Sequence, residues 1–206
     1  IRSWEDRLRD ELTARVEPAE AQRLADLYGP AFSEEYRAAM APEIAVHDLL
    51  ELEALRSGGR TVGITLREPP LRDRTAGPAD FTLLKLYLVG ERLVLSDFMP
   101  TLDHAGLRVV EVTPFSVAAS GLPDATIYTF AVQQPDGGAI PLDRSGLLSE
   151  MLLAVREGDA SDDPFNALVL AAGLRWRDVD VLRAYANFAF QINAVPTRYG
   201  PARALA

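Results

Sequence analysis

The fold is decided by residues 81–113, FTLLKLYLVGERLVLSDFMPTLDHAGLRVVEVT. Apolar and other residues alternate along 81–89 with a period of two, which predicts a β-strand. Gly90 interrupts this alternation. Residues 107–113 alternate again and predict a second strand, which is followed by Pro114.

A helix is predicted between these two strands, at Leu95–Ala105. Ser96 or Asp97 is expected to cap it, because such side chains accept hydrogen bonds from the N–H groups of a first helical turn. Pro100 is tolerated if it falls within that first turn. Gly106 suits the left-handed backbone position that commonly follows a helix.

Further elements surround this strand–helix–strand unit. Residues 61–67 and 126–133 alternate like strands, and residues 147–156 have helical spacing. The segment 69–80 holds three prolines and a glycine and is predicted to be a connecting loop. Residues 135–138, Pro-Asp-Gly-Gly, are predicted to form a turn.

The middle of the chain therefore has the order strand, strand, helix, strand, strand, helix. Moving the first strand to the end gives the split β-α-β order of ferredoxin-like sheets. We predict an α+β fold, ββαββα, in which a four-stranded antiparallel sheet carries both helices on one face. The other face would be covered by flanking helices or by a partner.

We predict three parts: a helical segment at 1–58, the α+β domain at 59–158 and a second helical segment at 159–206. Four helices are expected in the first part, and their start signals are Ser3 with Asp6, Pro18, Ser33 and Pro42. In the third part, a helix is expected between Asp163 and Gly173.

A last helix is predicted at about 177–193. Four small or apolar residues line one side of it: Val179, Leu182, Ala186 and Ala189. A second side carries Val181, Tyr185, Phe188 and Ile192. A helix that is apolar on several sides should be buried, and little of this chain remains to bury it. We therefore expect the chain to be a piece of a longer protein.

Composition excludes several classes of protein. The net charge of −9 argues against nucleic acid and anionic membranes as main partners. No apolar run reaches the length needed to span a bilayer. The absence of cysteine removes disulfides, thiol nucleophiles and zinc–thiolate sites, and it is compatible with the cytosol.

Catalytic, cofactor-binding and metal-binding residues are all predicted to be absent. No dinucleotide fingerprint, P-loop or nucleophile-elbow motif occurs. The lone lysine, Lys85, lies within an alternating apolar run, and the two histidines, His47 and His104, are explained as structural residues of helices. The segment Asp159–Leu170 resembles a calcium loop but has Pro164 where the required glycine should be.

One loop is a candidate effector site, formed by Gly90, Ser96 and Asp97. A strand there meets the start of a helix, and the N–H groups of a helix start can hold a small carboxylate. The alternative, which we favour, is that Gly90 is only a turn glycine.

Several stretches resemble a known family. They are WEDRLRDEL at 4–12, LSDFMPTLDHAGLRVVEVTPF at 95–115 and DPFNALVLAAGLRWRDVDVLRAYANFAFQ at 163–191. In these stretches the chain is similar to the large bacterial NAD-specific glutamate dehydrogenases. Two departures lie in the last stretch: Arg175 replaces a small hydroxyl residue, and residues 188–190 replace basic residues that are usual in the family.

The resemblance implies a region just before the catalytic module, with an ACT-like sheet in the middle. It implies a regulatory or structural role in a cytoplasmic enzyme that oxidatively deaminates L-glutamate, with NAD bound elsewhere in the full-length protein and no cofactor in this piece. The implied partners are the remainder of the polypeptide, further copies of it and an amino-acid effector. Two alternatives remain open: an amino-acid-sensing module and a purely structural oligomerisation module.

Overall fold

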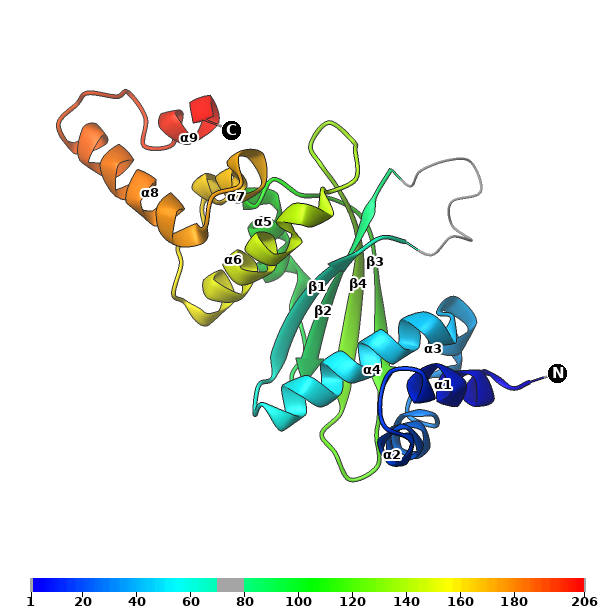
Figure 1. The fold of residues 1–206 in the computed structure, drawn as a ribbon. Coiled ribbons are helices and arrows are strands. Elements are labelled where there is room, and N and C mark those ends of the chain that lie inside the picture. The colour runs from blue at the N-terminus through cyan, green and yellow to red at the C-terminus, as the bar shows by residue number, and fades with distance from the viewer. Residues whose placement is uncertain (1, 70–79, 206) are drawn as a thin grey trace. The chain divides into compact units, whose positions relative to one another are not determined.

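The computed structural model describes residues 2–69 and 80–205 (Figure 1). The strands are β1 (Val62–Arg67), β2 (Thr82–Val89), β3 (Arg108–Val117) and β4 (Ala125–Gln133). The helices before the sheet are α1 (Trp4–Thr13), α2 (Pro18–Tyr28), α3 (Glu34–Ala39) and α4 (Pro42–Ser57). The later helices are α5 (Leu95–His104), η2 (Leu142–Arg144), α6 (Ser145–Glu157), η3 (Pro164–Asn166), α7 (Ala167–Ala172), α8 (Trp176–Gln191) and α9 (Gly200–Leu205). The loop predicted at 69–80 lies, except for its two end residues, outside the described residues.

The four strands form one antiparallel sheet in the order β1-β2-β4-β3. This is the order of a ferredoxin-like sheet when β1 is counted last. The predicted α+β fold with flanking helices is therefore confirmed. The central strand β2 is buried along its whole length, so both of its faces are covered.

The described residues divide into two compact units, and each contains part of the sheet. The first comprises the chain up to Gly63, together with Leu86–Arg92 and Thr113–Thr129. The second comprises the described residues of Ile64–Lys85, Leu93–Val112 and the chain from Phe130 onward.

The core of the first unit joins helices α1 to α4 to one face of the strand ends. Tyr87 and Val89 from β2, Phe115 and Val117 from β3, and Ile127 from β4 all belong to it. Within β2 and within β3 these residues are two positions apart, so they point to the same side of the strand. The alternation of side chains along the strands thus gives this face an apolar surface, and helices α1 to α4 bury it.

The start signals predicted for the first four helices are confirmed. Ser3 caps α1 in a capping box with Asp6, since each side chain accepts a hydrogen bond from the other residue's N–H. Ser33 caps α3. Pro18 and Pro42 each begin a helix, where the missing N–H of proline costs nothing.

The core of the second unit is built around α5, α6 and α7. The rings of Phe98 on α5 and Phe130 on β4 lie with their centroids 5.7 Å apart. Leu102 of α5 and Leu148 and Leu152 of α6 are fully buried. Helix α5 also contacts α6 and η3 directly.

Two details of the predicted α5 are wrong. Neither Ser96 nor Asp97 caps the helix, because it begins at Leu95 and its N-cap is Val94, which has no capping side chain. Pro100 is therefore the sixth residue of the helix and not part of its first turn. The end is as predicted: Gly106 has φ +75°, and the N–H of Leu107 bonds to the carbonyl of Leu102 at 2.9 Å.

The predicted end of the third strand is also wrong. Strand β3 passes through Pro114 and continues to Val117. It is an edge strand in the sheet order, and an edge strand tolerates proline because an N–H that points outward has no partner to lose. The alternation of Phe115 and Val117 into the core then extends the strand.

The C-terminal part is helical, as predicted, with differences in detail. Asp163 accepts a hydrogen bond from the N–H of Phe165, but the first turn is the short 3-10 helix η3. On α8 the buried residues are Val179, Arg183 and Ala186, so Arg183 takes the place predicted for Leu182.

Candidate functional site

A groove of about 560 Å³ opens in the first unit, where β2 ends and β4 begins. Gly90 lies at the end of β2 with φ +74°, a conformation that side chains disfavour. Its N–H donates to the carbonyl oxygen of Asp124, 2.8 Å away. Pro114 and Ser116 of β3 contribute a further wall.

Side-chain alternation explains why the groove lies on this face. In β3 and β4, Phe115 and Ile127 point into the core under the helices. Ser116 and Tyr128 have the other parity and line the groove. The groove therefore lies on the face of these strand ends that helices α1 to α4 do not cover.

Charged and hydroxyl groups line the groove. Arg92 supplies a cation, Glu91 and Asp124 supply carboxylates, and Thr126 supplies a hydroxyl. All three charged residues are exposed to solvent. A groove with one cation and two carboxylates suits a small ligand that carries both a negative and a positive charge.

Only one of the three predicted effector residues lines this groove, namely Gly90. Its N–H is already engaged by Asp124. Ser96 and Asp97 belong to the second unit, where both are exposed and lie 3.4 Å apart, Oγ to Oδ1. The Asp97 carboxylate sits in the first turn of α5, where it would repel a carboxylate ligand. Effector binding at this loop stays a prediction.

The first unit contains a buried carboxylate that the sequence did not predict. Asp48 on α4 is fully buried and accepts hydrogen bonds from Tyr36 at 2.5 Å and from Tyr87 at 2.8 Å. These bonds tie α3, α4 and β2 together. The sequence offers little sign of this burial. Asp48 lies among apolar residues of α4, but the helical pattern alone does not show whether its own side chain points to the core or to solvent.

A second polar cluster in the first unit surrounds Tyr28. The Tyr28 hydroxyl donates to Glu53 at 2.9 Å, and the Arg56 guanidinium donates to the same hydroxyl. Arg56 also donates to the carbonyl of Pro123 at 2.8 Å. Burial, together with the bond to Glu53, raises the pKa of Tyr28 to about 12.

The two histidines lie in helices, in positions that differ. His104 at the end of α5 pairs with Asp162, Nδ1 to Oδ1, at 2.7 Å. Asp162 also accepts a bond from the Thr101 hydroxyl at 2.6 Å. His47 is half-buried on α4. The pairing of His104 therefore closes the loop that precedes η3 onto α5.

The segment that resembles a calcium loop is used as a helix start. Asp163 accepts the Phe165 N–H through Oδ1 and the Arg183 guanidinium through Oδ2. Within residues 2–69 and 80–205, no group of three or more histidines and carboxylates is placed to hold a metal ion. The lone lysine, Lys85, is fully buried in β2. In the same ranges, no helix has the length and apolar character needed to cross a membrane.

Three sequence families, each described as a segment of glutamate dehydrogenase, match successive parts of this chain. Residues 11–55 match "Glutamate dehydrogenase, helical motif 2" and residues 69–145 match "Glutamate dehydrogenase, ACT3 domain". Residues 160–205 match "Glutamate dehydrogenase, helical motif 3". The ACT3 match covers β2, α5, β3 and β4, that is, three of the four strands of the ferredoxin-like sheet and one of its helices.

Three curated relatives carry the name NAD-specific glutamate dehydrogenase. Those of Pseudomonas aeruginosa and Halomonas elongata are each 32% identical over 93% of this chain, and that of Mycobacterium tuberculosis is 34% identical over 91%. The chain spans only about 12% of the length of the first two. The chain thus belongs to the glutamate dehydrogenase family, as a segment that carries helical motif 2, the ACT3 domain and helical motif 3.

Proposed function

We propose that this chain is a non-catalytic, structural and regulatory segment of an NAD-dependent glutamate dehydrogenase. The full-length protein would convert L-glutamate, NAD and water to 2-oxoglutarate, ammonia and NADH in the cytoplasm, with NAD bound outside this segment. We place its three parts at 1–58, 59–158 and 159–206.

The observation that carries this proposal is the order of the three matches along the chain. Helical and ACT matches account for most of the residues, and the polar clusters support a structural role. Asp48, Asp163 and His104 each hold one element against another through bonds within the chain. Such bonds are what a packing and assembly segment requires.

The test is an assay of the isolated chain with L-glutamate and NAD, read as NADH absorbance. We expect no turnover above the rate of a heat-unfolded sample, with the full-length enzyme as the positive control. Robust NADH formation by the isolated chain would overturn the non-catalytic assignment.

A second candidate function is amino-acid sensing at the groove beside Gly90. The groove favours it because the Arg92 guanidinium can pair with the carboxylate of an amino acid and the Asp124 carboxylate can pair with its ammonium group. Its volume is in the range of small-molecule sites.

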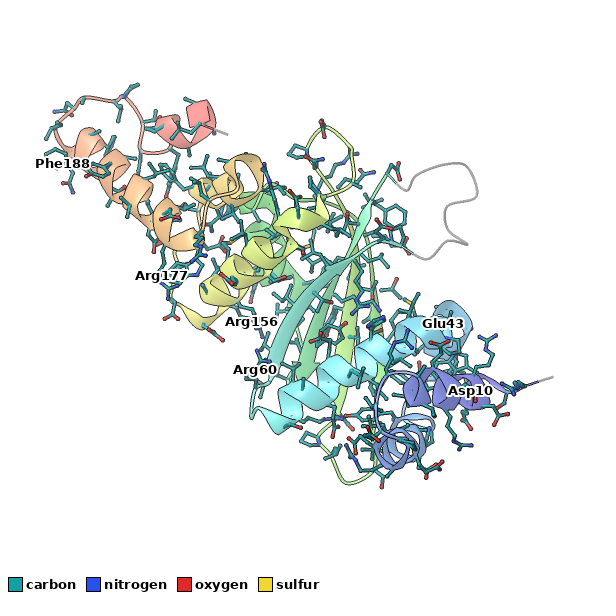
Figure 2. All side chains as sticks on the ribbon, in the orientation of Figure 1. Asp10, Glu43, Arg60, Arg156, Arg177 and Phe188 are labelled. Atoms are coloured by element: carbon teal, nitrogen blue, oxygen red, sulfur yellow. The ribbon has the colours of Figure 1, made fainter. Side chains whose placement is uncertain are left out.

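Calorimetry against a panel of free amino acids tests this function. Saturable binding that is lost in Arg92→Gln but kept in Arg60→Gln would support sensing. Arg60 is a fair control, since it is an exposed arginine of the same unit outside the groove (Figure 2). A flat response across the panel would rule sensing out and leave the structural role.

A further inference from the structure

Helix α8 exposes a row of large apolar side chains. Val181 is 55% exposed, Tyr185 71%, Phe188 60% and Ile192, at the C-cap, 59%. Figure 2 labels Phe188 toward the C-terminal end of this helix. We call these four residues the α8 seam.

The spacing of the α8 seam is four, three and four residues. The mean repeat, about 3.7 residues, is close to that of a straight α-helix. The alternation of four and three also matches successive d, a, d and a positions of a heptad, the seam through which two helices pack against each other. The spacing therefore suits packing against another helix.

The α8 seam lies on the side of the helix away from its own unit. Val179, Arg183 and Ala186 are the buried residues, and α8 contacts η3, α6 and α7. At 100° per residue, these three positions lie on the opposite side from Tyr185 and Phe188. The described part of the second unit thus buries one side of α8 and leaves the other exposed.

We propose that the α8 seam packs against a helix of the same polypeptide that lies outside residues 1–206 and carries its own apolar heptad seam. The proposal rests on the proposed function, since it takes this chain as one segment of a longer enzyme. It goes further because it names the surface, states that a helix covers it and states that this helix belongs to the same polypeptide.

The size of the surface favours an occupant from the same polypeptide over a second copy. Aromatic side chains bury about 150–250 Å² each, so the partly exposed α8 seam offers roughly 500 Å². A standard interface between separate proteins buries about 800 Å² on each partner. A covalently linked helix needs less area, because its effective concentration is high and less association entropy is lost.

The relatives are long enough to contain such a helix outside the matched segment, because this chain spans only about 12% of the Pseudomonas aeruginosa and Halomonas elongata proteins.

The test is photo-cross-linking in the full-length protein that contains this chain. Benzoylphenylalanine replaces Phe188, and the protein is assembled from a mixture of unlabelled and heavy-nitrogen-labelled chains. Mass spectrometry then identifies the cross-linked peptide and shows whether both halves come from one chain. We expect a peptide from a helix outside residues 1–206, joined within one chain.

A pair of double variants makes the test specific to the seam. Tyr185→Asp with Ile192→Asp places two charges on the seam and should lower the cross-link yield about tenfold or more, as a loss of about 1.4 kcal/mol in docking would. Ala184→Asp with Gln191→Asp places the same charges one residue away, about 90° from the seam, and should leave the yield within about twofold.

Three results would overturn the proposal: cross-links only to a second copy, cross-links only within residues 1–206, or no protein cross-link at all. The test is separate from the assay of turnover. NADH formation by the isolated chain would defeat the non-catalytic assignment without moving the cross-link, and a missing cross-link would defeat the docking proposal without affecting the assay.

Discussion

Arg183 and Asp163 form an ion pair that is almost sealed from solvent. The Arg183 Nε lies 2.7 Å from Asp163 Oδ2, and the two side chains are only 7% and 8% exposed. Arg183 also donates to the Asn166 side chain at 2.9 Å and to Asp180. One guanidinium therefore holds α8 against the cap of η3.

Arg183→Ala should lower the free energy of unfolding by about 3–5 kcal/mol, because it leaves a buried carboxylate without its counter-charge. Arg177→Ala is the matched control on the same helix. Arg177 is exposed and stacks only on the neighbouring Trp176 ring, 4.2 Å away, so its loss should cost about 1 kcal/mol or less. Urea unfolding measures both, and equal effects would contradict a special role for the buried pair.

The buried Asp48 cluster predicts a cost for removing one hydroxyl. Tyr87→Phe deletes the 2.8 Å bond to Asp48 without changing the ring and should destabilise the chain by about 1–2 kcal/mol. The same change at exposed Tyr185 should stay within about 0.5 kcal/mol. The two variants differ from the parent by the same single atom, so comparison of their urea midpoints isolates burial. A Tyr87→Phe variant as stable as Tyr185→Phe would show that the bond contributes nothing.

The raised pKa of Tyr28 predicts a loss of stability in alkali. Its ordinary pKa is about 10 and its folded pKa is about 12, so the folded state holds the proton more tightly. Stability from this group is complete below pH 10 and falls as the pH rises from about 10 to 12, by roughly 1–2 kcal/mol.

Tyr28→Phe removes this titration and serves as the comparison. The difference in unfolding free energy between the parent and Tyr28→Phe should shift across pH 10–12 and be constant between pH 7 and 9, where neither state titrates. Unfolding in urea at a series of pH values measures it. Parallel curves for the two proteins up to pH 12 would show that the Tyr28 pKa is not raised.

Two glycines predict opposite responses to the same substitution. Gly106 has φ +75°, and an added Cβ would meet only ordinary contact with Ala167, so Gly106→Ala should cost about 1–2 kcal/mol in backbone strain alone. Gly146 lies within α6 with open space around it, so Gly146→Ala should be neutral or stabilise by up to about 1 kcal/mol. Thermal unfolding compares them, and the same sign for both would contradict this account.

Local signals in the sequence predicted most elements because their causes are local. Ser3, Pro18 and Gly106 act within one helical turn, and the alternation in 81–89 acts within one strand. The misplaced details have non-local causes. Pro114 stays within a strand because β3 is an edge, which depends on the order of all four strands.

The candidate groove and the buried polar pairs were less predictable. The sequence predicts Gly90 as part of a candidate effector loop. It does not predict the groove itself, because Arg92 and Asp124, which both line it, are more than thirty residues apart in the chain. The apolar pattern of α8 assigns no buried position to Arg183, because an arginine without a counter-charge favours water. Its burial depends on Asp163, twenty residues earlier, which supplies the counter-charge.

The amino-acid sequence alone was enough to establish an α+β chain with a ferredoxin-like order of elements, the starts of its first four helices, its net negative charge and its family resemblance, since each follows from short-range periodicity, composition or motif. Only the folded chain decided which side of α8 is covered, that Asp48 and Arg183 are buried with partners, and that a groove opens beside Gly90. These depend on contacts between distant residues, whose free energy appears only when the strands and helices are packed together.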